Sequence, residues 1–275
     1  MSGRFTLIVG PQTRGAIALN AYARLHGAAL AKQGVKALPL RAASPVLWRV
    51  TNPARPLDDR KADFEAEIAR ETTTLCGLNF FGAPEAALKN GTLFPDHEVA
   101  LSPLGQVAGE AQVVLLVDAL PRFFLAPNAQ RLETRVKGTG WETLYDLGWV
   151  DLARAITDAL PRADLLVLTP EGMALHSEDL LQRFFGGTGD LPGDRFWLLR
   201  QAMTETGQAV LDRMRKDGAP DDTTRAELYA SFAAHPTLDE INERLGIEKI
   251  TVTLLEQRLE EDLKAIADLP RTEVL

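Results

Sequence analysis

The sequence predicts an α/β fold of three layers, in which helices cover both faces of a parallel sheet and extra helices follow at the C-terminal end. Three observations lead to this prediction. Short, continuously apolar segments such as Arg4–Val9 and Val113–Val117 are typical of strands buried on both faces. Helical segments alternate with these strands, as in βα units. From Phe196 onward the pattern is helical throughout.

The first 34 residues predict a strand, a glycine-containing loop and a helix. The apolar strand Arg4–Val9 leads into the loop Gly10–Gly15. An Ala- and Leu-rich segment without proline, Ala16–Gln33, then predicts a helix that Gly34 ends. This order of elements is the beginning of a βα unit.

The next part of the chain alternates less regularly. Lys36–Pro56 carries four prolines, which predicts an irregular segment with a short strand at Val46–Val50. The charged, amphipathic segment Leu57–Thr72 predicts a helix, and the β-prone segment Thr72–Leu78 predicts a strand. A brief helix is expected at Ala83–Lys89, before Asn90 and Gly91.

The second half of the chain predicts two more strands among helices. In chain order, the sequence predicts a strand at Val113–Val117, helices at Ala126–Val136 and Asp151–Leu160, a strand at Asp164–Leu168, and helices at Ser177–Phe185, Phe196–Arg215, Thr223–Ala234 and Thr237–Leu269. Ser177 is the predicted N-cap of its helix, and Gly246 is expected to interrupt the last one.

These elements suggest a main α/β domain over residues 1–215 and a helical extension over residues 216–275. Leucine and isoleucine recur at helical spacing in the extension, among many acidic side chains. Such a helix packs on its own domain or serves as a dimerisation arm, so a homodimer through the C-terminal helices is one of two expectations.

Composition excludes several classes of protein. The 275 residues include 30 basic and 38 acidic side chains, for a net charge of −8, which argues against a dedicated nucleic-acid binder. No segment approaches 18 apolar residues, so no membrane span is expected, and the N-terminal segment has no signal-peptide pattern. A single cysteine, Cys76, fits a reducing compartment, and a cytoplasmic location is expected. The four histidines have no metal-ligand spacing, so no metal is expected.

The loop between the first strand and the first helix is a candidate anion site. Backbone amides converge at a helix N-terminus, and the helix dipole favours negative charge there. Gly10 and Gly15 permit a close approach of a ligand, although a glycine in such a turn often serves only the bend. Ala16 and Ile17 follow where a Walker A motif has Lys and Ser or Thr, so ATP or GTP hydrolysis is not expected.

Several segments, in order, resemble the bacterial sulfotransferases that use 3′-phosphoadenosine 5′-phosphosulfate (PAPS). They are LIVGPQTRGAIALNAYARLHGAALAKQGV from Leu7, NFFG from Asn79, GTLFPD from Gly91 and VVLLVDALPRFFLAPNAQR from Val113. The resemblance covers roughly residues 4–215. It implies a P-loop-like fold, PAPS as the cofactor, and transfer of a sulfuryl group to a hydroxyl of a carbohydrate or small metabolite.

The resemblance also implies where the cofactor binds. The corresponding loop residues are Gly10, Pro11, Gln12, Thr13, Arg14, Gly15 and Ala16. Gln12 stands where the family has a lysine, so the catalytic residue stays unassigned. Asp118 and Ala126 stand where the family holds the 3′-phosphate with an arginine and a serine. Conventional PAPS catalysis is therefore not expected, because an aspartate repels a phosphate.

Three functions remain open from the sequence. One is sulfuryl transfer, with replacement charge from Arg14 in the loop. Arg122 and Arg131 are further sources of charge, or they lie on a solvated helix face. The second is a non-catalytic binding or interaction protein, a pseudoenzyme on the same fold. The third is another transferase that uses the cleft for a different phosphate-bearing ligand.

Overall fold

The computed structural model describes residues 4–69, 72–78, 80–82, 92–125 and 144–275. Its centre is a six-stranded, all-parallel sheet in the order β2-β3-β1-β4-β5-β6. The strands are β1 (Phe5–Gly10), β2 (Val35–Leu38), β3 (Thr72–Leu78), β4 (Gln112–Leu116), β5 (Asp164–Leu168) and β6 (Thr272–Val274). The predicted α/β class and parallel sheet are confirmed.

The two most apolar strands lie side by side at the centre of the sheet. Thr6 of β1 pairs with Gln112 of β4, and Val9 pairs with Leu115, as the sequence predicts for neighbouring buried strands. Side chains alternate between the faces, so Leu7 and Ile8 belong to different hydrophobic clusters. Both clusters are buried, which explains why these strands are apolar throughout.

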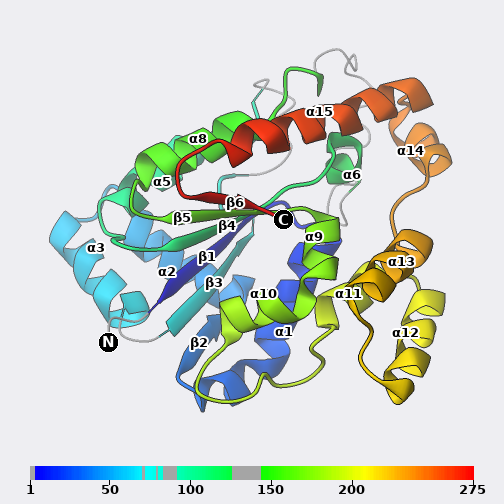
Figure 1. Ribbon diagram of the computed structural model, residues 1–275. Coiled ribbons are helices and arrows are strands. Elements are labelled where there is room, and N and C mark those ends of the chain that lie inside the picture. Colours follow the sequence, from blue (N-terminus) through cyan, green and yellow to red (C-terminus); the bar gives the residue numbers. More distant parts are fainter. Residues whose placement is uncertain (1–3, 70–71, 79, 83–91, 126–143) are drawn as a thin grey trace.

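Helices cover both faces of the sheet (Figure 1). One face carries α2 (Leu40–Thr51), α3 (Leu57–Phe64), a π-helical turn (Glu65–Ala69), α5 (His97–Gly105), α6 (Leu120–Phe124), α8 (Trp149–Ala159), α14 (Leu238–Leu245) and α15 (Lys249–Ala267). The other face carries α1 (Arg14–Ala31), α9 (Pro170–Leu175), α10 (Ser177–Phe185) and α11 (Trp197–Ala202). The predicted three-layer arrangement is thus confirmed.

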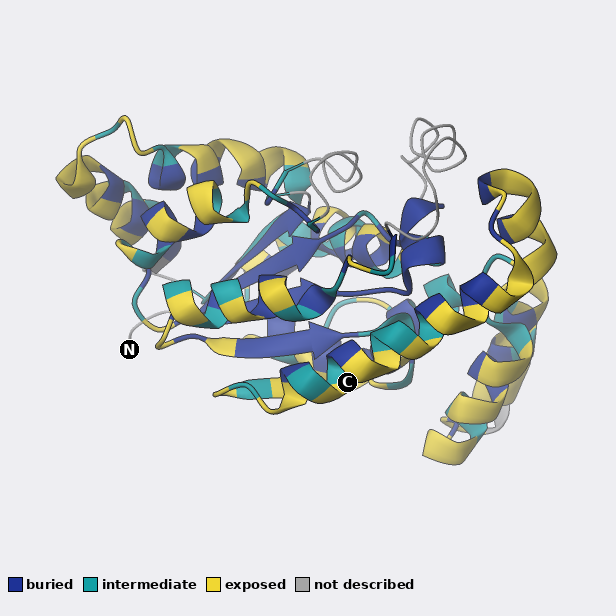
Figure 2. Cartoon of the chain, turned by 90° about the horizontal axis from the view of Figure 1, so that it is seen from above, coloured by how far each residue is buried: buried dark blue, intermediate teal, exposed yellow. Residues whose placement is uncertain are grey.

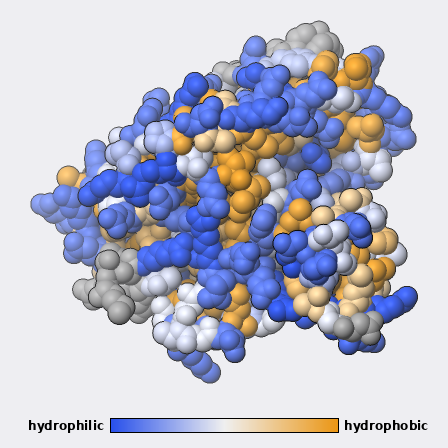
Figure 3. Space-filling view, viewed as in Figure 1, coloured by the Kyte–Doolittle hydropathy of each residue, from blue (hydrophilic) through white to orange (hydrophobic). Residues whose placement is uncertain are grey.

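A third, smaller cluster lies beyond the second layer. It joins α9 and α11 to α12 (Glu205–Asp217) and α13 (Asp222–Phe232). Figure 2 shows the strands buried along most of their length, while the outer faces of the helices are exposed. Figure 3 shows hydrophilic side chains over much of one face, with hydrophobic ones gathered toward its centre. Within the described residues, no helix is both long and apolar enough to cross a bilayer.

The prediction for Lys36–Pro56 is wrong. This segment forms β2 and α2 instead of an irregular stretch with a strand at Val46–Val50. Ala43, Val46, Leu47 and Val50 recur at helical spacing and are all buried against the sheet. That burial outweighs the cost of Pro45 inside the helix.

Two details of the later helices also differ. Ser177 does not cap α10, whose N-cap is His176. The Ser177 hydroxyl donates to the carbonyl of Arg195 and accepts from the amide of Leu198, at 3.0 Å each, and so ties α10 to α11. The segment Phe196–Arg215 is two helices, because the Thr204 side chain accepts from Gly207 N and caps a new helix there. The helices predicted at Ala83–Lys89 and Ala126–Val136 lie outside the described residues.

The C-terminal segment contributes to both a helical layer and the sheet. It breaks at Gly246, which has a φ of +69°, as the sequence predicts. Helix α15 packs against α8 and α6. The chain then returns beside β5 as β6, a strand that the sequence analysis did not predict.

Candidate functional site

The candidate site lies at the carboxyl edge of the sheet, between β1 and β4. From β1 the chain turns toward β2 and β3, whereas from β4 it turns toward β5 on the other side. The loops after these two strands therefore diverge, and parallel α/β sheets bind ligands in the crevice that such a divergence leaves. A cavity of about 400 Å³ occupies this position.

The cavity is lined by three strand-to-helix loops and by the helices after β5. Its lining residues are Thr13, Arg14, Gly15, Asp118, Arg122, Leu125, Pro170, Met173, Leu198, Ala202, Thr204, Ala234, His235, Pro236, Glu240 and Arg244. The three loops follow β1, β4 and β5, and the last five residues bring α14 and its preceding linker to the site.

Thr13 begins helix α1 at the cavity wall. It is the N-cap residue, and its hydroxyl accepts from the amide of Ala16 at 3.3 Å. Arg14 and Gly15 are the first two residues of the helix, and the amides of a first turn have no partners within their own helix. The positive end of the α1 dipole is therefore directed at the cavity.

The two glycines of this loop are explained by contacts within the protein. Gly10 has a φ of +125°, and a Cβ there would lie 2.6 Å from the carbonyl oxygen of Leu116 on the neighbouring strand. A Cβ on Gly15 would lie 1.7 Å from Cε of Met173. Gly10 thus requires glycine for the backbone, whereas at position 15 a Cβ would displace the flexible end of Met173; contacts within the protein are the simpler of the two explanations that the sequence allows.

We expect Gly15→Ala to destabilise the protein by about 1–2 kcal/mol, because the new methyl group displaces Met173 from its place. Combining it with Met173→Ala should recover part of that loss, which a double-mutant cycle of denaturant unfolding measures. Strict additivity of the two changes would show that Met173 is not what requires a glycine at position 15.

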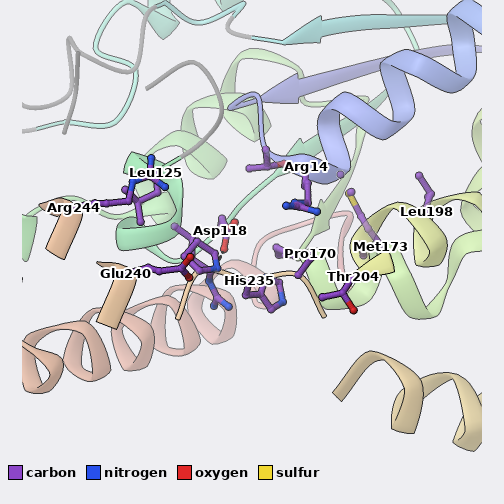
Figure 4. Close-up of a pocket in the computed structure, with 16 residues that line it drawn as sticks. Arg14, Asp118, Leu125, Pro170, Met173, Leu198, Thr204, His235, Glu240 and Arg244 are labelled. Carbon is purple, nitrogen blue, oxygen red and sulfur yellow. Dashed lines mark ion pairs between the residues drawn. The ribbon is translucent and has the colours of Figure 1, made fainter. Parts of the chain in front are cut away.

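Arg14 is the exposed cation of the loop. Its guanidinium faces the same space as His235 and Asp118 (Figure 4). No ion pair or side-chain hydrogen bond joins Arg14 to any residue that the structure describes. An arginine at a helix start, within a cavity and with no carboxylate partner among the described residues, presents its donors to an anionic ligand.

Asp118 and Arg122 form an ion pair in the cavity wall. Arg122 Nε lies 3.0 Å from Asp118 Oδ1, and the same oxygen accepts from the amide of Ala119 at 2.8 Å. Arg122 also lies 3.6 Å from Glu256 on α15. Asp118 is 6% exposed, and this burial raises its pKa to about 6 despite the nearby guanidinium. The arginine largely compensates the carboxylate charge near neutral pH.

His235, from the linker before α14, also lines the cavity and lies next to a buried tyrosine. Its Nε2 is 2.6 Å from the hydroxyl of Tyr229. Burial, reinforced by the charges of Arg122 and Arg14, lowers the pKa of His235 to about 4. The imidazole is therefore neutral at pH 7, and it can offer a ligand one hydrogen bond without adding charge.

The structure places the residues predicted for the cofactor in two groups. Thr13, Arg14 and Gly15 line the cavity together with Asp118. The other loop residues, Gly10, Pro11, Gln12 and Ala16, are not among its lining residues. Ala126 and Arg131 lie outside the described residues. Arg122 does not lie on a solvated face, because it is held by Asp118 and lines the cavity.

The cavity wall formed by the later helices was not predicted from the sequence. Thr204, His235, Glu240 and Arg244 all line the cavity, although they follow the strand β5 by more than thirty residues of chain. The sequence contains signals for where these helices begin, such as the capping box of Thr237 and Glu240. It contains no signal that α14 folds back over the loops of β1 and β4.

The chemistry of the lining is that of a site for an anion with polar groups around it. Arg14, Arg122 and Arg244 supply positive charge, and Asp118 and Glu240 supply negative charge. Among the described residues, no group of three or more His, Cys, Asp or Glu side chains is arranged to hold a metal ion. Comparisons of the chain with protein-family models, with curated proteins and with solved structures find no match.

Proposed function

We propose that the protein binds a phosphate- or sulfate-bearing small molecule in this cavity, with Arg14 as the residue that contacts the anionic group. The observation that carries the proposal is the position of Arg14: a guanidinium without a described ion pair, at the start of α1, inside a cavity at the carboxyl edge of the sheet. Helix N-termini with cations beside them are the usual sites for phosphate and sulfate groups.

The size and polarity of the cavity support a small-molecule ligand. Its volume of about 400 Å³ falls in the range of metabolite and cofactor sites. Thr204 and the neutral His235 supply hydrogen bonds, and Met173, Leu198 and Leu125 supply apolar contact. A ligand with one anionic group and a less polar body fits this lining.

The resemblance to sulfotransferases suggests PAPS or its product, adenosine 3′,5′-bisphosphate, as ligands to test first. Binding is proposed without sulfuryl transfer for two reasons. Gln12 supplies no positive charge and is not a lining residue. Asp118 lies in the cavity wall where the resemblance places a cation for the 3′-phosphate, and its partner Arg122 is already engaged. Sulfuryl transfer supported by Arg14, and transfer of another phosphate-bearing group, are the alternatives.

A thermal-shift assay followed by calorimetry tests the proposal. The ligands are PAPS, adenosine 3′,5′-bisphosphate, ATP and inorganic phosphate, each against buffer alone. A ligand at about 100 times its Kd stabilises the folded protein by roughly 2.7 kcal/mol, which is a clear shift in Tm. We expect at least one of the four to bind, more weakly at higher salt.

Replacing Arg14 with glutamine should weaken the binding of that ligand about tenfold to a hundredfold, since a charge-assisted hydrogen bond contributes about 1.5–3 kcal/mol. Arg24→Gln is the matched control, because Arg24 is exposed on the same helix and outside the cavity. Equal affinity of wild type and Arg14→Gln would reject Arg14 as the anion contact. Turnover of PAPS with a hydroxyl acceptor would instead favour the transferase alternative.

A further inference from the structure

A second cavity lies at the same edge of the sheet but does not share residues with the first. Its volume is about 470 Å³, and it lies over the end of β3, between α2 and α5. The lining residues are Leu40, Ser44, Leu47, Trp48, Thr51, Asn52, Pro53, Gly77, Leu78, Phe80, Phe81, Gly82, Asp96, Val99 and Ala100. From this cavity we infer a separate binding site for a small apolar amine.

Apolar side chains line this cavity both at its floor and at its rim. Leu47, Leu78 and Phe81 are buried, at 3%, 5% and 1% exposure. At the rim, Trp48 is 63% exposed and Val99 is 65% exposed. Large apolar side chains that stay exposed beside an apolar cavity are typical of ligand sites, because a bound molecule completes their burial.

The polar groups of the cavity leave one strong acceptor for a ligand. The Ser44 hydroxyl donates to the carbonyl of Leu40 at 2.7 Å, and the Thr51 hydroxyl donates to that of Leu47 at 2.8 Å. The side-chain oxygen of Asn52 accepts from the amide of Ala54. These groups are therefore engaged with their own backbone.

Asp96 is the charged acceptor of this lining, and its position is unusual. It is the N-cap residue of α5, yet its side chain makes no capping hydrogen bond. Its carboxylate instead lies beside Gly82, where a Cβ would approach Oδ2 to 3.4 Å. No ion pair joins Asp96 to a residue within the described ranges.

The charge of the side chains that line this second cavity indicates which class of ligand it binds. Its only ionised side chain among the described residues is Asp96, and no lysine or arginine lines the cavity there. Asp96 is exposed at the rim, and a carboxylate at the mouth of an apolar cavity attracts a cation and repels an anion. An aromatic ring such as that of Trp48 also attracts an ammonium group. The site thus takes a primary amine on an aromatic or aliphatic body, and it is independent of the anion site proposed above.

Three matched probes test this inference: 2-(2-naphthyl)ethylamine, 2-(2-naphthyl)ethanol and 2-naphthylacetate. They share one apolar body and differ in charge. Calorimetry, with ligand-observed NMR for weak binding, measures each affinity. We expect the amine to bind with a Kd of about 1 mM or tighter, the alcohol about threefold to tenfold more weakly, and the carboxylate most weakly.

Two variants locate the site. Asp96→Asn should lower the affinity for the amine to that for the alcohol and leave the alcohol unchanged. Trp48→Ala should weaken the amine and the alcohol alike. Asp96 and Trp48 are both exposed, so the two variants should fold normally. The controls are Glu98→Gln on α5, which also removes an acidic charge, and Leu25→Ala on α1, which also removes an exposed apolar side chain; neither residue lines the cavity.

The inference is overturned if the amine shows no saturable binding, or if the carboxylate binds as tightly as the amine. It is equally overturned if amine selectivity survives in Asp96→Asn, or if Trp48→Ala binds as well as wild type. Because Arg14 does not line this cavity, Arg14→Gln should leave amine binding unchanged. Failure of the anion site and failure of the amine site are thus separate results.

Discussion

Trp149→Ala should lower the free energy of unfolding by about 3–5 kcal/mol, the usual cost of removing a fully buried tryptophan. Trp149 is 1% exposed, and its ring centroid lies 5.8 Å from that of Phe123 and 6.3 Å from that of Phe94. Its indole N–H donates to the carbonyl of Asp118 at 3.0 Å. The ring therefore supports both the aromatic core and the loop that carries the ion pair of the anion cavity.

Two further variants separate these roles. Trp149→Phe keeps an aromatic ring but leaves the Asp118 carbonyl without its donor, and should cost about 1–3 kcal/mol. Trp48→Ala removes a tryptophan that is 63% exposed and should change stability by less than about 0.5 kcal/mol. Urea unfolding of the three variants measures the loss in free energy of unfolding for each. A loss for Trp149→Ala no larger than that for Trp48→Ala would contradict the buried position of Trp149.

Asp118→Asn should make the protein more stable than wild type at pH 7, by about 3 kcal/mol, and equally stable near pH 3.5. The pKa of Asp118 is raised from 3.8 to about 6 by burial, so the folded state binds its proton more tightly than the unfolded state. Wild-type stability is therefore lost as the pH rises from about 4 through about 6. A shift of about two pKa units corresponds to about 3 kcal/mol.

The groups that act on Asp118 are Arg122, the amide of Ala119 and Glu256. His235 titrates in the same range with the opposite sign. Its pKa falls to about 4 on folding, so its contribution is present above pH 6.5 and is lost as the pH falls through about 4. The difference between Asp118→Asn and wild type isolates the aspartate, because His235 is present in both.

Unfolding free energies at pH 4, 5, 6 and 7 measure this difference. A pH-independent difference would show that Asp118 titrates normally in the folded protein. The comparison variant is Asp151→Asn, since Asp151 is exposed on α8 and its pairing with Arg154 is a surface contact. That variant should follow wild type within about 0.5 kcal/mol at every pH.

The sequence predicted the strands best where burial on both faces makes them apolar, as in β1 and β5. It failed where tertiary contacts override a local signal. The four prolines of Lys36–Pro56 led to the prediction of an irregular segment. The helical spacing of its apolar residues instead determines the structure, because that apolar face is buried as helix α2. The three residues of β6, Thr-Glu-Val, are too few to show any period.

The candidate site was predictable from the loops after β1 and β4, where Asp118 and Arg122 were also named, but not from the later helices. A loop between a buried strand and a helix start is a local pattern, and it identified Thr13, Arg14 and Gly15. This loop and His235 line one cavity although they are more than two hundred positions apart, and no local pattern encodes that proximity. The engagement of Arg122 by Asp118 was also hidden, because their spacing fits a solvated helix face equally well.

Strand β6 is synthesised long after β5, its neighbour in the sheet, and this order has a consequence during translation. Arg271, just before β6, bonds to Asp164 at the start of β5 across a separation of 107 residues. At about 5–20 residues per second, the ribosome needs on the order of 5–20 seconds to supply the partner of β5. During that interval β5 is an open sheet edge, and open edges are where nascent chains aggregate. The helices α9 to α15 are all made before β6 covers this edge, so the edge strand of the finished sheet is the last strand that the ribosome supplies.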